Sequence, residues 1–264
     1  PQDWQTILAA NNAQPPMTLR VNAQKCTQDQ YQQALHAIEM DAIPVANTGL
    51  QLAQAAPVQE LPHFAQGWVS VQDAAAQAAA PLLLAQLPKP QGRPLRVLDA
   101  CAAPGGKSAA IIAATGGKAL LTATDLHEHR LPTLKENLDR QGSPFVRTAQ
   151  ADWSLPCRTE WKGRFDAVLL DVPCSNTGVI QRRVDVRWRL TPEEIRRLAA
   201  LQKTILENAS HAVKPGGRLV YSTCSIDAEE DGLLVRVFLQ NHPEWTLKEE
   251  KLILPHEEKS DGAY

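Results

Sequence analysis

The sequence LRVLDACAAPGGKSAAIIAAT, residues 95–115, joins a short apolar run to a helix-forming run through a turn of small residues. Its first part, LRVLDA (95–100), has the length and composition of a buried β-strand, and GGKSAAIIAAT (105–115) begins a helix. Small side chains in the turn allow a ligand to approach the backbone N–H groups at the helix N-terminus. The stretch therefore predicts a strand–turn–helix unit that binds a ligand at the turn.

The alternation of strand and helix continues downstream of this unit. Further strands are predicted at 119–125, 145–150, 165–171 and 217–223, and further helices at 127–141, 191–213 and 228–240. The strand FDAVLLD (165–171) is almost wholly apolar, which is typical of a strand buried on both faces of a parallel sheet. The alternation predicts an α/β fold with a Rossmann-like, doubly wound sheet.

The first 66 residues have a different composition, rich in Gln, Asn, Ala and Pro. MTLRVN (17–22) has the pattern of a short strand, and TQDQYQQALHAIEM (27–40) places its apolar residues on one face of a helix. We therefore expect a small α+β domain at 1–66 that is RNA-binding-like, followed by a catalytic domain at 67–264.

The composition limits the compartment and the partners. The formal net charge of −2 gives no general attraction to nucleic acid, so an RNA partner must be met by a local basic patch. Five cysteines without a C-x-x-C pair argue against a disulfide framework and a zinc ribbon, and they favour a reducing, cytoplasmic location. The apolar stretch at 74–86 is interrupted and too short to span a bilayer. We expect no bound metal, no membrane partner and a monomer.

Three kinds of ligand compete for the glycine turn. A dinucleotide fingerprint needs G-x-G-x-x-G, which the turn lacks. A phosphate-binding P-loop needs G-x-x-x-x-G-K-[ST], and Gly106-Lys107-Ser108 supplies its end. However, Cys101 occupies the position of its first glycine, and Pro104 lacks an N–H group. An S-adenosylmethionine site needs the small-residue turn without a phosphate cradle, and an NTP-hydrolysing enzyme stays open as the alternative.

Acidic residues at the ends of successive strands favour S-adenosylmethionine. Asp125 ends the second strand of the series, where a carboxylate can accept both ribose hydroxyls, and Asp152 follows the third, placed for an adenine amino group. Asp171 ends the fourth strand. In an open α/β sheet the ligand lies beyond the carboxyl ends of the strands. Each of these residues alone is more often a turn or cap residue, but together they indicate a cofactor site.

Two cysteines, each followed by serine, come just after predicted strands, in DVPCS (171–175) and YSTCS (221–225). If those strands are neighbours, they lie about 4.8 Å apart. The thiols of Cys174 and Cys224 can then face one substrate above the sheet. A cysteine is otherwise often a small buried hydrophobic residue, which is our interpretation of the remaining cysteines outside the glycine turn.

A thiol beside a methyl donor suits methylation of a pyrimidine at carbon 5. That carbon is a poor nucleophile, and a thiolate that adds to carbon 6 activates it for attack on the methyl group. Removal of the carbon 5 proton then expels the thiol. A carboxyl group at the N3/N4 edge of the base assists the addition, and Asp171 is placed for this role.

The motifs LDACAAPGGK, DVPCSNTG and YSTCS resemble motifs I, IV and VI of the RNA cytosine-5 methyltransferases of the NOL/NOP/Sun family. GWVSVQDAAAQ (67–77), LRVN (19–22) and TGVIQRRVDVRWR (177–189) resemble its bacterial Sun/Fmu branch, which modifies 16S ribosomal RNA. The resemblance extends along almost the whole chain. It implies an S-adenosylmethionine-dependent enzyme that methylates a cytidine at carbon 5 through a covalent cysteine adduct.

The resemblance also assigns roles to the two cysteines. It implies Cys224 as the nucleophile and Cys174 in product release, either as the proton acceptor or through one. DNA cytosine methyltransferases use a cysteine in a Pro-Cys motif IV, so the reversed assignment stays open. We expect the turn and the three acids to bind the cofactor: Cys101, Ala102, Ala103, Pro104, Gly105, Gly106, Lys107, Asp125, Asp152 and Asp171.

The chain departs from the family pattern at several points. Val172 stands where the family usually has Ala, and Asn176 stands where it has Gly or Ala. Neither change removes a reactive group, so we expect activity to be retained. Full-length members carry an N-terminal NusB-like helical domain that we do not find here, and the chain stops at SDGAY, apparently within a strand. It also starts without methionine, so we expect a fragment that binds RNA weakly.

A basic, aromatic stretch follows motif IV and is the expected RNA contact. Arginine beside an aromatic side chain suits phosphate contacts and base stacking. The residues are Arg182, Arg183, Arg187, Trp188 and Arg189. The target cytidine should be unpaired or flipped out, because carbon 6 is not reachable within a stacked duplex. A solvated helix start with intrahelical ion pairs is the alternative for the stretch, and an RNA-binding scaffold without catalysis is the alternative for the protein.

Overall fold

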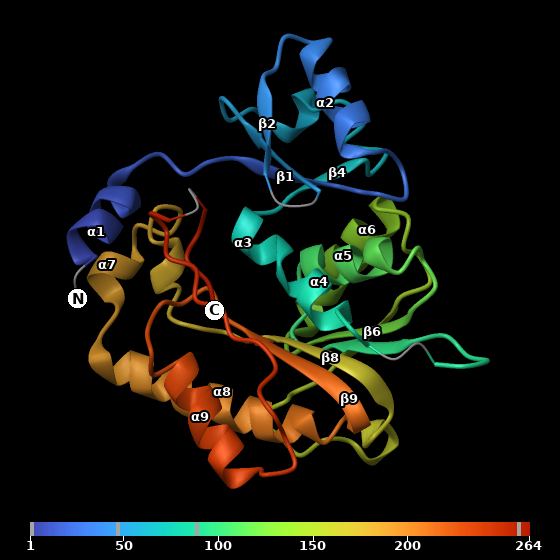
Figure 1. The fold of residues 1–264 in the computed structure, drawn as a ribbon, viewed down its shortest axis with the longest axis vertical. Helices are drawn as coiled ribbons and strands as arrows, with labels where there is room; N and C mark the ends of the chain where they lie inside the picture. Colours follow the sequence, from blue (N-terminus) through green and yellow to red (C-terminus); the bar gives the residue numbers. More distant parts are fainter. Residues whose placement is uncertain (1–2, 46–47, 88–89, 258–259) are drawn as a thin grey trace.

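The computed structural model describes residues 3–45, 48–87, 90–257 and 260–264. Two β-sheets organise this part of the chain, a four-stranded sheet near the N-terminus and a five-stranded sheet beyond it. In Figure 1 the N-terminal sheet and its helix lie above helices α5 (Gly106–Ala114) and α6 (Leu131–Arg140) of the larger unit. No helix in the described ranges is long and apolar enough to cross a membrane.

The five-stranded sheet is parallel throughout and has the order β7-β6-β5-β8-β9. Its strands are β5 (Arg96–Asp99), β6 (Leu120–Asp125), β7 (Arg147–Gln150), β8 (Phe165–Asp171) and β9 (Val213–Ser222). The chain runs outward from β5 to β7 and then returns to the other side of β5 for β8 and β9. This order confirms the doubly wound α/β fold, and it places the switch point, where ligands bind, above β5 and β8.

Helices bury both faces of this sheet. Helix α4 (Ala79–Leu84) packs with α5 on one face, while α8 (Pro192–Ser210) and α9 (Gly232–Asn241) cover the other. Along β8, Val168 and Leu170 belong to the core under α8 and α9, whereas Ala167 and Leu169 belong to the core under α4 and α5. The near-continuous apolar sequence of β8 follows from this burial on both sides.

Several predicted boundaries differ from the structure: the helix predicted over 27–40 ends at His36, and the helix predicted over 228–240 begins at Gly232. Thr191 caps α8 through Glu194 N–H as predicted, but the helix ends at Ser210, and residues 211–213 do not continue it. Strand β9 begins at Val213, earlier than the predicted start at 217, because Val213 already pairs with Phe165. The short helices α3 (Ala74–Gln77) and α7 (Val186–Arg189) were not predicted either.

The N-terminal sheet is antiparallel with the order β2-β3-β1-β4. Its strands are β1 (Thr18–Val21), β2 (Ala42–Val45), β3 (Gly49–Leu52) and β4 (Val69–Val71). Helix α2 (Gln28–His36) starts with a capping box at Thr27 and buries Tyr31 and Leu35 against the sheet. Strand β4 lies past residue 66, where we expected the first domain to end, because Val69–Val71 pairs with β1.

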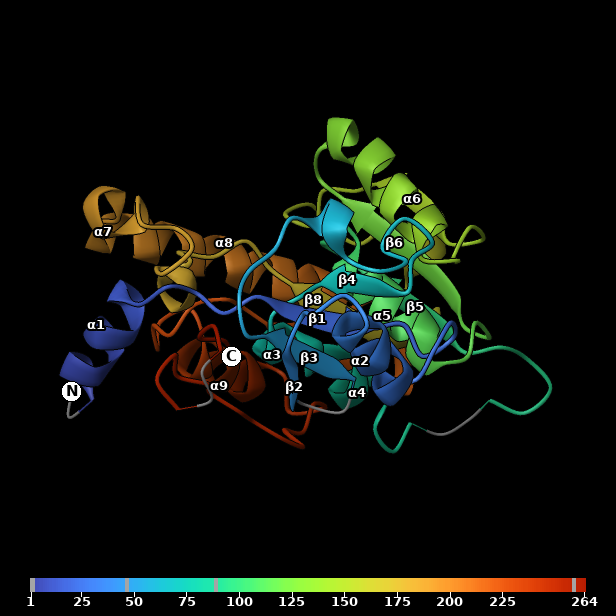
Figure 2. The same ribbon diagram turned by 90° about the horizontal axis from the view of Figure 1, so that it is seen from above.

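Helix α1 (Trp4–Asn12) lies apart from that sheet and beside α7, as both views show (Figures 1 and 2). Arg187 of α7 donates to the side chain of Asn12 at 2.6 Å and to the carbonyl of Asn11. The first helix therefore packs against the segment that follows motif IV, although 174 residues or more separate the two in sequence.

A buried arginine joins the two sheets. Arg20 of β1 is 4% exposed and donates to Gln72 Oε1 at 2.6 Å, to Gln141 Oε1 at 2.7 Å and to the carbonyl of Gly106 at 3.3 Å. Burial, reinforced by the neighbouring charge of Arg140, lowers the pKa of Arg20 to about 10. The N-terminal unit thus contacts the first residue of α5, directly behind the glycine turn.

Candidate active site

The glycine turn between β5 and α5 is fixed by the elements around it. Gly105 has φ +105°, and a Cβ atom there would lie 2.8 Å from Leu134 Cδ1, so glycine is required on both counts. Ala103 N–H donates to Asp125 Oδ2 at 3.2 Å, and Asn137 Nδ2 donates to the carbonyl of Pro104 at 3.0 Å. The turn is therefore held against β6 and α6.

Two features of the turn suit a cofactor such as S-adenosylmethionine. Gly106 is partly exposed and carries no side chain, so its backbone is accessible at the start of α5. Asp99, fully buried at the end of β5, receives Ser108 Oγ–H at 2.6 Å on one oxygen, while its Oδ1 has no partner among the described residues. Burial raises the pKa of Asp99 to about 7, against the lowering effect of the Ser108 hydrogen bond.

Asp125 and Asp152 lie on the same side of the sheet but in different environments. Asp125 is 3% exposed and already accepts from the N–H of Ala103 and His127, with Arg130 at 3.2 Å. Asp152 is exposed and accepts from Ser154 N–H and Oγ–H, which is a local turn interaction. Asp125 is thus a preformed acceptor beside the turn, whereas Asp152 lies at its outer rim.

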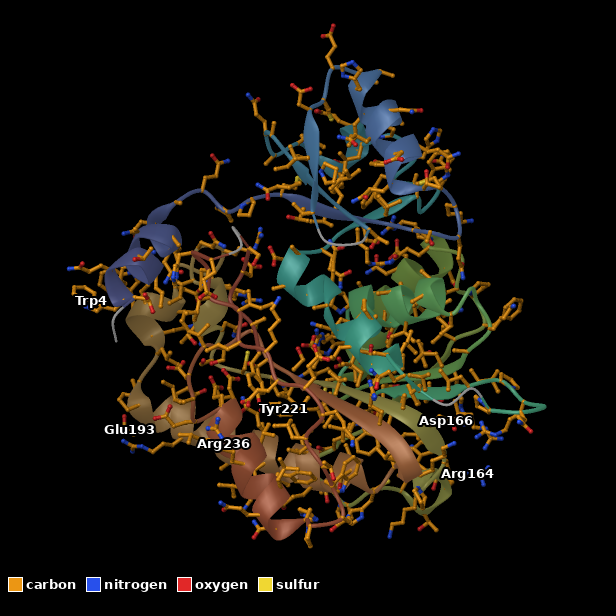
Figure 3. All side chains as sticks on the ribbon, in the orientation of Figure 1. Trp4, Arg164, Asp166, Glu193, Tyr221 and Arg236 are labelled. Carbon is orange, nitrogen blue, oxygen red and sulfur yellow. The ribbon has the colours of Figure 1, made fainter. Side chains whose placement is uncertain are left out.

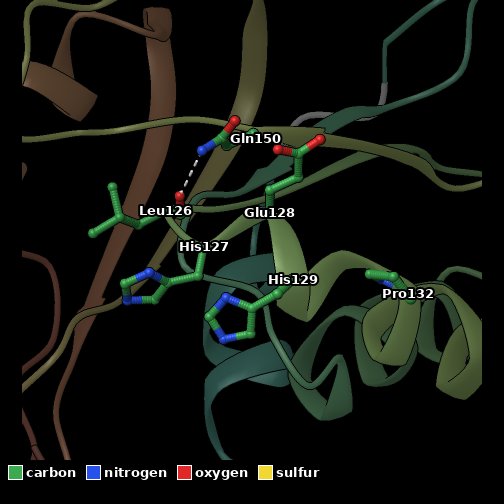
Figure 4. Close-up of a pocket in the computed structure, with 6 residues that line it drawn as sticks. All are labelled: Leu126, His127, Glu128, His129, Pro132 and Gln150. Carbon is green, nitrogen blue, oxygen red and sulfur yellow. Dashed lines mark hydrogen bonds between the residues drawn. The ribbon is translucent and has the colours of Figure 1, made fainter.

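An open hollow of about 580 Å³ adjoins Asp125 at the carboxyl ends of β6 and β7 (Figure 4). Its lining residues are Leu126, His127, Glu128, His129, Pro132 and Gln150. The side chain of Gln150 donates to the carbonyl of Leu126 at 3.1 Å, and the rings of His127 and His129 lie 5.4 Å apart. The hollow therefore lies at the same edge of the sheet as Asp125, the acid at the end of β6.

The two cysteines after β8 and β9 meet at the centre of the site. Strands β8 and β9 are neighbours, and Cys174 Sγ lies 3.1 Å from Cys224 Sγ with both residues free and partly exposed. Cys224 Sγ also lies 3.2 Å from Asn176 Oδ1, and Asn176 Nδ2 donates to the Cys174 carbonyl at 2.9 Å. The hydrogen bond between Cys174 and Cys224, followed by burial, raises the pKa of Cys174 above its ordinary value, as expected where the Cys174 thiol is the donor.

A lysine–aspartate pair stands next to the thiols. Lys107 Nζ, from the first turn of α5, lies 2.7 Å from Asp171 Oδ2 at the end of β8. Burial lowers the pKa of Lys107, but the carboxylate of Asp171 and the nearby Cys224 outweigh it, so the net shift is upward. The pair therefore carries a fixed ammonium and carboxylate between the glycine turn and the thiols.

The predicted RNA-binding stretch has a mixed environment. Arg182 is exposed but is bound by protein carboxylates, with its guanidinium 2.7 Å from Asp261 Oδ2 and 3.2 Å from Asp73 Oδ2. Arg189 pairs with Asp185 at 2.5 Å within α7, as the intrahelical alternative predicted. Trp188 is 87% exposed, and Arg183 is also exposed. Together with the contacts of Arg187 to α1, these pairs leave Arg183 and Trp188 as the most accessible members of the stretch.

Several residues of the site were not identified from the sequence. Asn176 was noted as a departure from the family pattern, but its contact with Cys224 was not foreseen. A buried polar cluster beneath the thiols, containing Gln202 and Glu230, was also missed. The sequence offers one weak signal for it: the acid-rich segment AEED precedes α9, where an N-terminal acid is normally interpreted as interacting with the helix dipole.

Comparison with known proteins places the site in a family. A family model described as 16S rRNA methyltransferase RsmB/F matches residues 85–263. The chain belongs to this family. A second model, described as an RsmF/B-like ferredoxin-like domain, matches residues 1–59. The RsmB/F family is S-adenosylmethionine-dependent, which agrees with the accessible backbone of the glycine turn and confirms the resemblance inferred from the motifs.

Curated relatives and solved structures agree with membership of the RsmB/F family. The ribosomal RNA small subunit methyltransferase B of Vibrio cholerae is 43% identical over 276 residues, and the chain spans 61% of that relative's length. A methyltransferase homologue from Pyrococcus horikoshii is 26% identical, with a TM-score of 0.79 over 99% of this chain and 88% of that one. NSun6 from Pyrococcus horikoshii, solved with SFG, has the same fold at 18% identity, with a TM-score of 0.85 over 99% of this chain and 92% of that chain.

Proposed function

We propose that the chain transfers a methyl group from S-adenosylmethionine to carbon 5 of a cytidine in 16S ribosomal RNA. The observation that carries the proposal is the pair of free thiols 3.1 Å apart, at the carboxyl ends of two adjacent strands and beside the Lys107–Asp171 pair. A relative of the RsmB/F family named for small-subunit ribosomal RNA supports the choice of substrate. Family membership favours this function over the NTP-hydrolysing alternative for the glycine turn.

The cofactor would lie along the glycine turn and the acids at the strand ends. When bound, S-adenosylmethionine supplies an electrophilic methyl group. The turn from Cys101 to Lys107 leaves its backbone accessible because its side chains are small, and Asp125 offers carboxylate oxygens for the ribose hydroxyls. Asp152, at the outer rim, is the candidate partner for the adenine amino group.

Cys224 acts as the nucleophile in this proposal. Its thiolate forms a bond to carbon 6 of the cytosine, and the electron pair of the 5,6 double bond moves to carbon 5, which then takes the methyl group. A base takes the carbon 5 proton, the electron pair of the carbon 5–hydrogen bond re-forms the 5,6 double bond, and the carbon 6–sulfur bond breaks with its electron pair on Cys224, which leaves as thiolate. The methyl–sulfur bond of the donor would break with its electron pair on the donor's sulfur, and Cys174 is the candidate base or the relay to one.

Asp171 and Lys107 orient the base during the addition. Asp171 is a candidate acceptor for the N4 amino group at the N3/N4 edge, and Lys107 holds its carboxylate at 2.7 Å. The ring gains negative charge as the thiolate adds, so the ammonium of Lys107, held in place before the reaction, is the group that stabilises this charge without reorganisation, while Asp171 orients the base.

Cys174 suits a later step because of its coupling to Cys224. The hydrogen bond between the two thiols is the first cause of the raised pKa of Cys174, so Cys174 stays a neutral thiol while the other sulfur is free. Once Cys224 is bonded to carbon 6, that cause is removed. Cys174 can then lose its proton to solvent more readily and, as thiolate, accept the carbon 5 proton or relay it.

The target cytidine would be unpaired or flipped out of its stack. The exposed indole of Trp188, 87% accessible, with Arg183 nearby in the chain, offers a stacking surface and a phosphate contact in the segment that follows motif IV. Contacts within the protein hold Arg182, Arg187 and Arg189, so these three arginines stabilise the fold in addition to any contact with RNA.

The test is methylation of a 16S ribosomal RNA transcript with labelled donor, followed by mapping of the modified base. Cys224→Ala should lower turnover by at least about 10³-fold, because it removes the nucleophile. Cys157→Ala is the matched control, since that thiol is buried in the core away from the site. An active Cys224→Ala enzyme, or a label on an atom other than carbon 5, would contradict the proposal.

Cys174→Ala separates the roles of the two thiols. It should accumulate an RNA–protein adduct on a denaturing gel, because bond formation to carbon 6 continues while release is slowed. An adduct formed by Cys224→Ala instead would support the reversed assignment. Calorimetry with ATP and with S-adenosylmethionine tests the NTP alternative, which binding of ATP alone would favour.

A further inference from the structure

The serines that follow the two cysteines point away from the substrate side and into the protein. Ser175 and Ser225 are 2% and 0% exposed, and their hydroxyl oxygens lie 3.3 Å apart. The cysteines before them are partly exposed. Each Cys-Ser pair thus places its sulfur in the site and its hydroxyl in a polar cluster beneath it, which explains why the same dipeptide follows both strands.

The centre of that cluster is Glu230, a fully buried carboxylate just before α9. It accepts from Ser175 N–H at 2.9 Å, from the Ser175 hydroxyl, and from Gln202 Nε2 at 2.7 Å. The preceding residue, Glu229, is exposed. A buried carboxylate is retained only when donors compensate its desolvation, and here three donors surround it.

Gln202, on α8, also holds the motif IV loop, at Pro173. Its side chain is fully buried, and its amide nitrogen donates one hydrogen to Glu230 and the other to the Pro173 carbonyl at 2.9 Å. Tyr221 of β9 donates to the backbone carbonyl of Glu230 at 2.6 Å and lies 3.2 Å from Gln202 Oε1. The residue before Cys174 and the residue after it are therefore held by one connected cluster.

Cys174 depends on this cluster more than Cys224 does. Pro173 has no N–H group, so the chain cannot continue the ladder of β8 at that point. Cys224 is held independently, because Gly178 N–H donates to its carbonyl at 3.0 Å and the preceding Thr223 pairs with Tyr264 in both directions. Weakening the cluster should therefore displace the Cys174 thiol first.

We propose that Glu230 and Gln202 are positioning residues that hold Cys174 for product release, an inference that rests on the proposed function above. Neither side chain is placed against the substrate. Both act through the backbone on either side of Cys174, fixing its sulfur relative to Cys224 at 3.1 Å. A thiol misplaced by about 1 Å in such a step can cost about 10²-fold in rate.

The experiment measures methyl transfer and adduct release separately, in single-turnover reactions with a 16S ribosomal RNA transcript and labelled S-adenosylmethionine. Glu230→Ala should release product about 10- to 100-fold more slowly than wild type, while methyl transfer changes much less. An RNA–protein adduct should accumulate on a denaturing gel, as it does with Cys174→Ala. Glu230→Gln keeps an acceptor for Ser175 N–H and should restore most of the release rate.

Two further variants control for loss of folding. Glu229→Ala removes the adjacent, exposed carboxylate and should behave as wild type. Gln202→Met keeps the volume of the side chain on α8 while removing both donors, so it should show the same adduct even if Glu230→Ala unfolds.

The outcomes distinguish this inference from the function on which it rests. If wild type does not methylate the transcript, or if Cys174→Ala forms no adduct, the proposed function fails and the positioning role fails with it. If those two behave as expected but Glu230→Ala and Gln202→Met turn over without adduct, the inference alone is wrong. Equal losses of methyl transfer and release in both variants would likewise contradict it, because they indicate a general structural role.

Discussion

Strand β8 carries an aspartate near each end, and the two have opposite surroundings. Asp166, near its start, is fully buried and bound by Arg93 at 2.7 Å, by Lys214 and by the N–H of Arg96 at 2.8 Å. Asp171, at its end, is a third exposed and has one cationic partner, Lys107. Figure 3 labels Asp166 near the start of β8. It also labels Tyr221, which pairs with Leu170 towards the end of β8.

The two ends of the sheet differ in how many of their carboxylate oxygens already accept a hydrogen bond. At the amino end every oxygen of Asp166 has a donor, and the Arg93 hydrogen bonds hold the pKa of Asp166 well below its usual range. At the carboxyl end Asp99 Oδ1 has no partner among the described residues, and Asp171 keeps an exposed edge. The saturated end stabilises the fold, and the unsaturated end is available to ligands.

Asp171→Asn is the strongest test of this contrast. It removes the charge that Lys107 holds and that we assign to the N3/N4 edge of the base, so kcat should fall by about 10²–10³-fold. The melting temperature should fall less than for a substitution of Asp166, because Asp171 is partly solvated and only one cation, Lys107, loses its partner. Methylation kinetics and thermal unfolding of the same sample measure both effects; a large loss of stability would remove the contrast between the two ends.

Asp166→Asn should have the complementary effect. It leaves two cations beside an uncharged, fully buried side chain, and we expect a loss of about 2–3 kcal/mol in the free energy of unfolding. Urea unfolding measures this loss, and kcat per folded molecule should stay near that of wild type. A variant that is stable but inactive would show that the amino end also shapes the site.

The last expected effect, on stability alone, is a dependence on pH from the unsaturated end. Burial raises the pKa of Asp99 to about 7, whereas an unfolded aspartate titrates near about 3.9. The folded state therefore binds this proton more tightly, and its contribution to stability is full below about pH 4 and is lost as the pH rises through 7. Burial raises the pKa of Asp231 to about 7 in the same sense.

Thermal unfolding at pH 5, 6.5 and 8 tests this dependence. The melting temperature of wild type should fall across the series, and Asp99→Asn should remove about half of the fall, because Asp231 supplies the other half. The Asp231→Asn variant should remove a similar share. An identical pH dependence in wild type and Asp99→Asn would show that Asp99 is solvated or paired in solution.

The sequence predicted best which residues meet at the carboxyl ends of the parallel strands. Four site residues lie at the last position of a strand or just after it: Asp125, Asp171, Cys174 and Cys224. Because the carboxyl ends of parallel strands meet at one edge of the sheet, local sequence patterns suffice to bring these residues together. The order of the strands then decides which are adjacent, and β8 lies beside β9 as the two-cysteine hypothesis required.

Contacts between distant segments were not predictable in the same way. Arg182 was expected at RNA because its neighbours are basic, but Asp73 and Asp261, far away in sequence, bind its guanidinium. Gln202 lies on the apolar side of α8, where periodicity expects a hydrophobic residue, and only the fold brings it to Pro173 and Glu230. Such side chains carry no local pattern, because their partners exist only after the elements have packed.

The buried guanidinium of Arg20 has a consequence for protein engineering. In a chimaera with a foreign N-terminal sheet, the Gly106 carbonyl and the side chain of Gln141 would lose the donor that now satisfies them. The Gly106 carbonyl belongs to the first residue of α5, beside the glycine turn, so we expect the graft to lower cofactor affinity as well as solubility. We therefore expect the small sheet to support the proposed methyl-donor site, so that it cannot be exchanged freely.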